Sequence, residues 1–562
     1  MLTTVERIAK WVAGLRFEDL PGRIVERARA QRLSVWGGAA AGMALPCAGK
    51  ILAVARGENE FQRKDAETQC EDASGVAPLR LSALASKSPA GAGARRGATF
   101  VPTGERMDVR GVVLATGALA TAFDYDEIVL VGHTGQTAAA LPWALVEAAG
   151  GNPLTERAAH ERAVVAQVAA VEVMGRLGLA TFFGPQNGQM LPYLHQVGAA
   201  IAAAKVWGLD ADATANAIGL ALLAPPAPLW PAFLSPLDAK LFITALPALT
   251  GLDCAQLARA GITAARDAFD NAHGFFQRFT TLSAPNALTG FGRAWLFDTL
   301  SVKAWPACWY FQTAIQAARD IAQKHGPLAF RDVRAVSVDA NLLGCAVDAH
   351  SALLGESALT PNRVNFSLAL TVALTLMKGD LDVRDLGAEA LSASATGIGE
   401  WNRCITVRHS LDHSLAVLQN IDAMLDLVGL IGASPLAIAK AWRAAKAYFP
   451  SVPSFSGRSE RPWARVAKIA LALPGVARRF RARGAYDLGE RDLSRGKMPM
   501  GATVRVEFAN GTTEAATVDL HEGAHGSTVT PLMAAEKKFE RHLGETLGAW
   551  AADFLSPKLD RR

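Results

Sequence analysis

Apolar residues recur at helical spacing through most of the first half of the chain. In residues 1–55 the pattern is interrupted at Leu20 and Pro21, which predicts the end of one helix and the start of another. In residues 111–268 long stretches rich in Ala, Leu and Val repeat the same period. Small residues on many faces allow helices to pack closely around a shared centre. We therefore expect an all-helical domain over residues 1–285.

The pattern changes after about residue 286, where apolar and polar residues alternate as they do in strands. The strand-like segments are 330–342, 404–412 and 502–520, and the helical ones between them are 364–377 and 422–442. The last strand-like segment carries Asn510 and Gly511, a strong signal for a hairpin turn. This mixture predicts a smaller α+β domain over residues 286–525, in a protein that is mainly helical.

Two stretches fit neither pattern. Residues 57–105 are rich in small, polar and charged side chains, which cannot bury enough apolar area to offset the entropy lost on ordering. We expect a surface insertion or a disordered loop there, and a second insertion in the basic, Pro-interrupted region near residues 430–500. Residues 526–562 return to helical period, and we expect this C-terminal helix to pack back on the helical domain.

Composition supports a packed globular protein of at least two domains. The chain has 562 residues, and single hydrophobic cores stop growing at about 250 to 300 residues. Half of the residues are hydrophobic and 19% are charged, which argues against wholesale disorder. The net charge of +5 is too small for a nucleic-acid-binding surface but suits an anionic metabolite. The expected partner is therefore a small molecule.

The remaining composition favours a cytoplasmic protein. The N-terminal residues lack the uninterrupted apolar segment of an export signal, and the longest uncharged stretch, residues 213–237, contains five prolines. We therefore expect no membrane segment. Six cysteines are scattered without CxxC pairs, so we expect reduced thiols and no metal site.

Signatures of nucleotide-dependent and hydrolytic enzymes are missing from the sequence. There is no GxxxxGK[ST], HExxH, GxSxG or protein-kinase motif. We therefore expect chemistry that needs no cofactor.

The most unusual local string contains three carboxyl groups, Asp124, Asp126 and Glu127, shortly before His133. Like charges this close raise one another's proton affinity, which suits acid and base chemistry. The alternative is an acidic helix end followed by a loop histidine without a chemical role.

At this string the sequence resembles the MmgE/PrpD family, which includes 2-methylcitrate dehydratase and cis-aconitate decarboxylase. The family pattern DYDDT, followed closely by HPS or HPG, reads here as DYDEI and HTG. Asp124 and His133 match this pattern, and Ile128 stands where the family usually has Thr. The helix, Leu-Pro stop and second helix of residues 15–42 also follow the opening of the family.

Further matches place two lysines on the lysines of the family's active site. The segment DAKLF contains Lys240, and SVKAWPAC contains Lys303. The resemblance implies a large helical domain, a smaller α+β lid domain and a homodimer. It also implies that the two lysines anchor a substrate carboxylate, that His133 transfers a proton, and that Asp124 orients His133 or binds the substrate.

The pocket departs from the family at several positions. Gln189 stands where a second histidine is expected, and Leu370 stands where a tyrosine is expected. His195, six residues after Gln189, is a candidate substitute for the lost histidine. The candidate substrate-binding residues are therefore Gln189 and His195, and the candidate pocket-lining residues are Asp126, Glu127, Ile128 and Leu370. A pocket with fewer polar groups suits a less carboxylated or more apolar substrate.

Three functional hypotheses follow. The leading one is a cofactor-independent lyase that dehydrates or decarboxylates a small carboxylate through His133. The second keeps the same pocket but isomerises, epimerises or cyclises a biosynthetic intermediate, because proton abstraction beside a carbonyl serves these outcomes too. The third is a non-catalytic relative that binds a carboxylate or serves as a scaffold.

Overall fold

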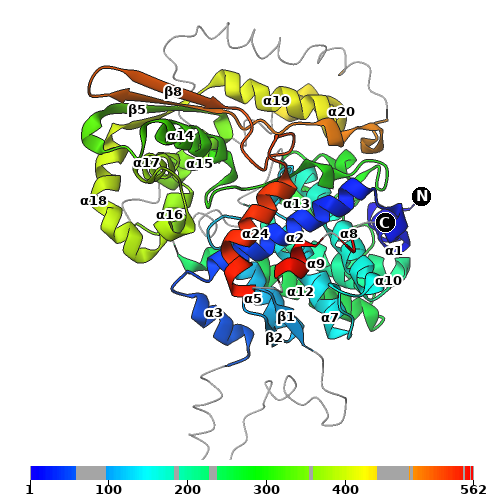
Figure 1. Ribbon diagram of the computed structural model, residues 1–562. Coiled ribbons are helices and arrows are strands. Elements are labelled where there is room, and N and C mark those ends of the chain that lie inside the picture. The colour runs from blue at the N-terminus through cyan, green and yellow to red at the C-terminus, as the bar shows by residue number, and fades with distance from the viewer. Residues whose placement is uncertain are drawn as a thin grey trace, which may run out of the picture.

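The chain forms a mainly helical body with a smaller part built around a sheet (Figure 1). The computed structural model describes residues 2–58, 97–182, 189–226, 237–352, 359–439, 480, 485–547, 551–556 and 558–560. This architecture agrees with the predicted fold class of a helical domain with an α+β part.

Helices of the first half make up the larger body. They are α1 (Thr4–Gly14), α2 (Gly22–Gly42), α3 (Ala48–Ala55), α5 (Val109–Thr121), α6 (Gly135–Ala138), α7 (Ala140–Ala148), α8 (Arg157–Phe182), α9 (Leu191–Val206), α10 (Ala211–Ala221), α12 (Phe242–Arg259) and α13 (Phe275–Phe279). Asp side chains cap two of them, since Asp108 accepts from the Gly111 N–H and Asp210 from the Ala213 N–H. The Ala- and Gly-rich sequence allows close packing: a Cβ added at Gly251 would lie 2.0 Å from the Gln196 carbonyl oxygen.

Apolar composition alone does not distinguish these helices from membrane spans. Two stretches, Arg157–Phe182 and Asp238–Arg259, are long and apolar enough to cross a membrane. The apolar window of the first is completely buried inside the protein, and that of the second is half buried. The core position of α8 explains its apolar sequence, while the cytoplasmic location stays a prediction.

The region expected to be a surface insertion has a folded end. Residues 98–107 form the antiparallel pair β1 (Ala98–Phe100) and β2 (Glu105–Met107), with Ala98 and Phe100 completely buried. The prediction for residues 57–105 is therefore wrong at this end, because strands of three residues are too short to show an alternating apolar pattern. Residues 59–96 lie outside the described part of the chain.

Four strands form the sheet of the smaller part, in the order β6 (Ile405–His409), β5 (Val333–Ala340), β7 (Ala502–Phe508), β8 (Thr513–Val518). β5 and β6 are parallel, and the other neighbours are antiparallel. The predicted strands and the hairpin are confirmed, and Gly511 adopts a φ of 83° in the turn. The helix α14 (Gln312–His325) packs on β7 and β8.

Two helices predicted as continuous are interrupted. The first, 364–377, is divided into α16 (Pro361–Asn365) and α17 (Leu368–Lys378), and the Ser367 hydroxyl caps the second piece. In the region of the second, 422–442, α19 (Leu411–Leu425) ends at Asp426, whose φ is 48°, and α20 (Leu427–Ile431) begins there. Asp can adopt this left-handed conformation without a glycine. The sequence therefore continues its apolar period through a turn that it does not signal.

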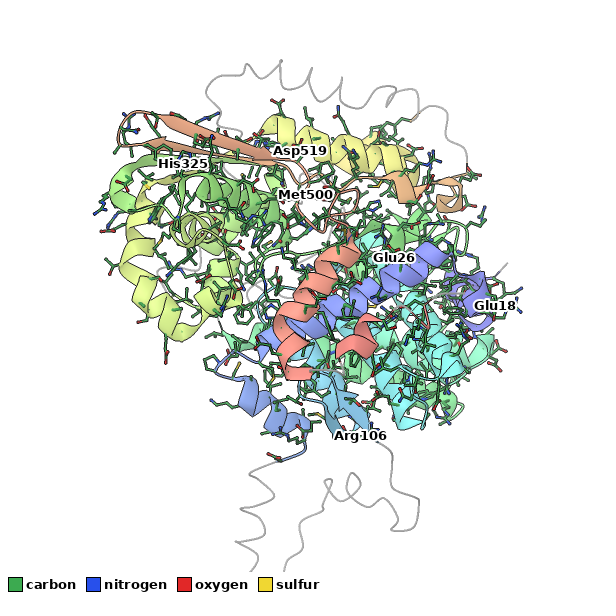
Figure 2. All side chains as sticks on the ribbon, viewed as in Figure 1. Glu18, Glu26, Arg106, His325, Met500 and Asp519 are labelled. Carbon is green, nitrogen blue, oxygen red and sulfur yellow. The ribbon has the colours of Figure 1, made fainter. Side chains whose placement is uncertain are left out.

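Most of the second predicted insertion, residues 440–479 and 481–484, lies outside the described residues. Its end is packed, since Leu488, Leu493 and Met498 are almost completely buried. Figure 2 labels the nearby Met500, whose carbonyl accepts hydrogen bonds from Thr313 (2.7 Å) and Asn341 (3.2 Å) of the smaller part.

The C-terminal helix α24 (Pro531–Leu547) crosses the helical body beside α2, as Figure 1 shows in red and blue. This agrees with the expected return of the chain to the first helices. A short helix, α25 (Ala551–Leu555), follows, and its Leu555 carbonyl accepts a hydrogen bond from Arg29 of α2.

Candidate functional site

The three neighbouring carboxyl groups found in the sequence follow the end of α5. Asp124 has a φ of 50°, an uncommon left-handed conformation for a residue other than glycine. Glu127 then begins β3 (Glu127–Val129), which pairs with β4 (Leu300–Val302). This pairing brings Lys303, the residue after β4, beside the loop.

A tight turn brings His133 back to the same loop. Val129 and Gly132 exchange backbone hydrogen bonds of 2.8 and 3.0 Å, and Leu130 between them has a φ of 55°. The chain therefore reverses after β3, and the residues after Gly132 return toward the residues before β3. The sequence places Asp126 and His133 seven residues apart, and the turn makes them neighbours.

His133 contacts Asp126 directly. Its Nδ1 is hydrogen-bonded to Oδ2 of Asp126, and the same carboxylate oxygen accepts from Gln136 Nε2 at 2.6 Å. A carboxylate can only accept, so Nδ1 carries the hydrogen and Nε2 is the nitrogen that can take up a proton. The resemblance implied that Asp124 could orient His133, but in the structure Asp126 makes this contact.

Both predicted lysines are buried and contact Asp124. Lys240 Nζ lies 3.1 Å from Asp124 Oδ1 and 4.2 Å from the ring centroid of Phe366. Lys303 Nζ donates to Asp124 Oδ2 at 2.8 Å. Both lysine side chains have an exposed fraction of 0%. Each buried ammonium therefore pairs with a carboxylate in place of water. This pairing lowers the free-energy cost of burying the charge.

Lys303 makes two further hydrogen bonds. Its Nζ donates to the Asp124 carbonyl oxygen and to Asp126 Oδ1, both at 2.6 Å. An ammonium has three N–H donors, so these two bonds and the one to Asp124 Oδ2 use all of them. Lys303 thus links the two aspartates, and it could donate to a substrate only by giving up one of these bonds.

Positive charge controls the protonation of the two aspartates. Burial alone would raise the pKa of Asp124, but Lys240 and Lys303 lower it below its usual value. Burial would likewise raise the pKa of Asp126, and His133 and Lys303 lower it far below its usual value. The charge of Asp126 does raise the pKa of Asp124, as the sequence predicted, but the positive groups outweigh this effect and the net shift is downward. The sequence did not show that Lys303 lies between the two aspartates or that Lys240 contacts Asp124.

Glu127 behaves differently from its neighbours. Burial and the charge of Asp126 raise its pKa to about 7. Its Oε1 accepts from the Gly135 N–H at 2.6 Å and from Gln31 Nε2 at 3.1 Å, while Oε2 is buried without a hydrogen-bond partner. A Cβ added at Gly135 would lie 2.2 Å from Oε1, so this approach requires glycine. Glu127 therefore fixes the loop that carries His133.

His195 lies behind this loop in α9. Its Nδ1 is hydrogen-bonded to the Thr137 hydroxyl at 2.7 Å, and Nε2 is buried without a partner. Burial and the nearby His133 lower the pKa of His195 to about 3, so this ring is neutral at physiological pH. The structure thus brings His195 near the site, and its proposed contact with substrate stays a prediction.

The remaining predicted site residues have local roles in the structure. Gln189 Oε1 accepts the Met190 N–H at 2.6 Å, just before α9 begins. Ile128 is 2% exposed, in β3 opposite Ser301. Leu370 is 6% exposed and belongs to the core around α17. The part of the chain that the structure describes shows no hydrogen bond from Gln189 to the charged cluster, and the pocket role of all three residues stays a prediction.

The sequence did not identify several residues around the cluster. Gln136 orients Asp126, and Lys538 of α24 donates to the Tyr125 carbonyl at 2.8 Å. Burial raises the pKa of the Cys308 thiol to about 12, and the charge of Asp124 raises it too, so the thiol is protonated. Asn365 is completely buried with both side-chain polar atoms unpaired, and its carbonyl accepts the Cys308 N–H at 3.0 Å. Of these residues, only Gln136 had a signal in the sequence, namely its closeness to His133.

Together these contacts form a charge-balanced centre with one proton-accepting nitrogen. Two carboxylates face two ammonium groups, and His133 is the least buried member, with 12% of its side chain exposed. A proton taken up by His133 would be stabilised by the Asp126 carboxylate. The arrangement is therefore suited to proton transfer.

Comparison with known proteins identifies the first part of the chain. Residues 78–287 match the family model MmgE/PrpD N-terminal domain, and this range contains Asp124, Asp126, His133 and Lys240. Lys303 lies outside the matched range. A search of curated proteins found no match.

Proposed function

The chain belongs to the MmgE/PrpD family, and from this membership and the charged cluster we propose a cofactor-independent lyase in which His133 transfers a proton of a small carboxylate. The family suggests dehydratase or lyase chemistry on such substrates. The observation that carries the specific proposal is the contact between His133 Nδ1 and Asp126 inside a cluster with two buried lysines.

In the proposed reaction, His133 Nε2 takes the proton from the carbon next to a carboxylate. The electron pair left on carbon forms the new double bond as a hydroxide or other leaving group departs from the neighbouring carbon. Asp126 keeps the ring in the tautomer with Nδ1 protonated and stabilises the imidazolium. The tautomer and orientation of the ring therefore depend on a contact that the structure already contains.

We assign the anchoring of the substrate carboxylate to the positive charge of Lys240 and Lys303. Both ammonium groups are buried, and Coulomb attraction is stronger there than in water. Because the bonds of Lys303 to Asp124 and Asp126 use all its donors, its contribution is charge rather than a new hydrogen bond. Lys240→Met is expected to raise KM more than it lowers kcat.

The experiment offers purified protein a panel of methylcitrate, citrate, cis-aconitate and alkylated analogues and identifies products by NMR. His133→Asn keeps an N–H for Asp126 but lacks the accepting nitrogen, and we expect it to lower kcat about 10²- to 10⁴-fold. The matched control is His325→Asn, at an exposed histidine (labelled in Figure 2) that contacts Glu514 on the sheet part. Equal turnover by both variants would overturn the role of His133.

The reaction products also distinguish between the three functional hypotheses. Loss of water or of carbon dioxide identifies dehydration or decarboxylation, and a product of unchanged mass identifies isomerisation, epimerisation or cyclisation. A carboxylate that raises the unfolding temperature without being turned over would instead support a binding protein, because a ligand specific to the native state stabilises it by mass action.

A further inference from the structure

The C-terminal helix places a buried lysine directly behind the charged cluster. Lys538 of α24 is 2% exposed, and its Nζ donates to the Tyr125 carbonyl at 2.8 Å and to the Ser34 hydroxyl of α2 at 3.1 Å. The ammonium also lies 3.9 Å from the centroid of the Tyr125 ring. Two of these three contacts therefore involve Tyr125, the residue between Asp124 and Asp126.

Two buried lysines hold two successive carbonyl groups of this loop. Lys303 donates to the Asp124 carbonyl at 2.6 Å, and Lys538 donates to the Tyr125 carbonyl at 2.8 Å. Asp124, at the start of this stretch, has a left-handed backbone conformation. Such a conformation persists only when the surrounding structure holds it. The Tyr125 hydroxyl adds a third contact, to the Ala304 carbonyl at 3.1 Å.

We propose that Lys538 is a positioning residue of the active site: by holding the Tyr125 carbonyl it fixes the direction in which the Asp126 carboxylate meets His133. This inference rests on the proposed function for its effect on turnover. Its effect on the loop itself does not depend on that function.

The energetic cost of Lys538 supports a role beyond packing. Burial lowers its pKa to about 7, and the carboxyl groups of Glu127 and Asp126 only partly oppose this effect. Its two hydrogen-bond acceptors are neutral oxygens, so the desolvated charge is less well compensated than those of Lys240 and Lys303. An apolar side chain of similar length would be cheaper to bury at this position. A costly polar group is expected where it orients functional residues.

Lys537 provides a matched control within the same helix. It is the neighbouring residue but is more exposed to solvent, whereas Lys538 is buried. Lys538→Met removes the ammonium and keeps a chain of similar length, and Lys537→Met makes the same chemical change nearer the surface. Ser34→Ala removes the second acceptor of Lys538 while leaving its bond to Tyr125.

The first measurement needs no substrate. Hydrogen exchange of the full-length protein is followed by mass spectrometry. In Lys538→Met, residues 123–136 should exchange at least tenfold faster than in the wild type, while α2 and α24 should change little. Lys537→Met and Ser34→Ala should resemble the wild type. Equal acceleration throughout α2 and α24 would mean a purely structural role and overturn the proposal.

The second measurement uses the carboxylate that the wild type turns over. Lys538→Met should lower kcat at least tenfold with KM changed less than twofold, while Lys537→Met keeps both within twofold. Unchanged kcat in folded Lys538→Met would overturn the proposal. If that variant does not fold, Lys538→Gln is measured in the same way. If the wild type turns over no carboxylate, the proposed function fails, and the exchange experiment alone decides the role of Lys538.

Discussion

At the scale of single residues, neighbours in the sequence have opposite electrostatic properties. Asp126 is stabilised as a carboxylate by His133 and Lys303, while burial and the charge of Asp126 raise the pKa of the adjacent Glu127 to about 7. The identity of these residues could be predicted from the sequence. Their protonation could not, because Lys303 is 177 residues away from Asp126 in the chain.

Glu127 should make stability depend on pH. Its pKa is higher in the folded protein than the usual value of 4.5, so the folded state binds more protons between pH 4.5 and 7. Stability from this group is present below about pH 4.5 and is lost as the pH rises through 7. Glu127→Gln lacks this loss, so its stability relative to wild type should increase by about 1 to 3 kcal/mol from pH 5 to pH 8.

Urea unfolding of both proteins at the two pH values measures this difference. The comparison uses the change with pH rather than the absolute stability, because the substitution would also alter the hydrogen bond that Gly135 donates to this side chain. A difference between the two proteins that stays constant from pH 5 to pH 8 would show that Glu127 has an ordinary pKa.

At the scale of elements, the turn after β3 converts a linear motif into a site. The hallmark residues Asp124 and His133 were evident in the sequence, but the chain reversal at Leu130 was not, because a Leu with positive φ carries no turn signal. Gln189 and Leu370 stand where the family has a histidine and a tyrosine, but in the structure Gln189 bonds the adjacent Met190 and Leu370 packs in a hydrophobic core. The hydrophobic period therefore predicted where the helices and strands lie. It did not predict which side chains from different elements contact one another.

Close packing of this turn against Glu127 predicts the effect of one methyl group. In Gly135→Ala the new Cβ would lie 2.2 Å from Glu127 Oε1 and 2.6 Å from Val35 Cγ2, so the loop must shift. We expect a loss of about 1 to 3 kcal/mol in the free energy of unfolding. Chemical denaturation measures it.

Gly132→Ala is the control in the same turn, because its Cβ would have its nearest neighbour, Leu194 Cδ1, at an ordinary 3.5 Å. Its loss should stay below about 1 kcal/mol. Equal losses in the two variants would argue against the close approach of Glu127 to Gly135.

At the scale of the whole molecule, the hydrophobic cores do not divide at residue 285. One core joins the first helices with residues such as Leu296 and Leu425, and the other joins Ala118 of α5 with Val504 of the sheet. The order of a helical body followed by a sheet could be predicted from the change of period. The shared cores could not, because they depend on contacts between distant segments, and the predicted domain boundaries stay a prediction.

A buried ion pair in α8 joins segments across the predicted boundary. Arg176 pairs with Glu172 at 3.1 Å, donates to the Ala294 carbonyl at 2.6 Å and stacks 4.4 Å from the ring centroid of Phe291. Arg176→Met leaves the Glu172 charge without its partner in the core. We expect a loss of about 3 to 5 kcal/mol in the free energy of unfolding.

The control for this prediction is Arg157→Met in the same helix, at an exposed Arg whose pair with Glu161 spans 3.3 Å. Its loss should be below about 0.5 kcal/mol. Similar losses for the two variants in denaturant unfolding would contradict the assignment of Arg176 as the link between α8 and the segment around residue 291.

The central claim is that His133, oriented by Asp126, transfers a proton next to a carboxylate. The most direct measurement follows deuterium incorporation from D₂O into the carboxylate panel by NMR, because proton exchange at carbon is visible whichever bond breaks afterwards. We predict exchange or turnover of at least one carboxylate by the wild type and by His325→Asn, and a loss of at least about 100-fold in His133→Asn. Undiminished exchange in His133→Asn would contradict the claim.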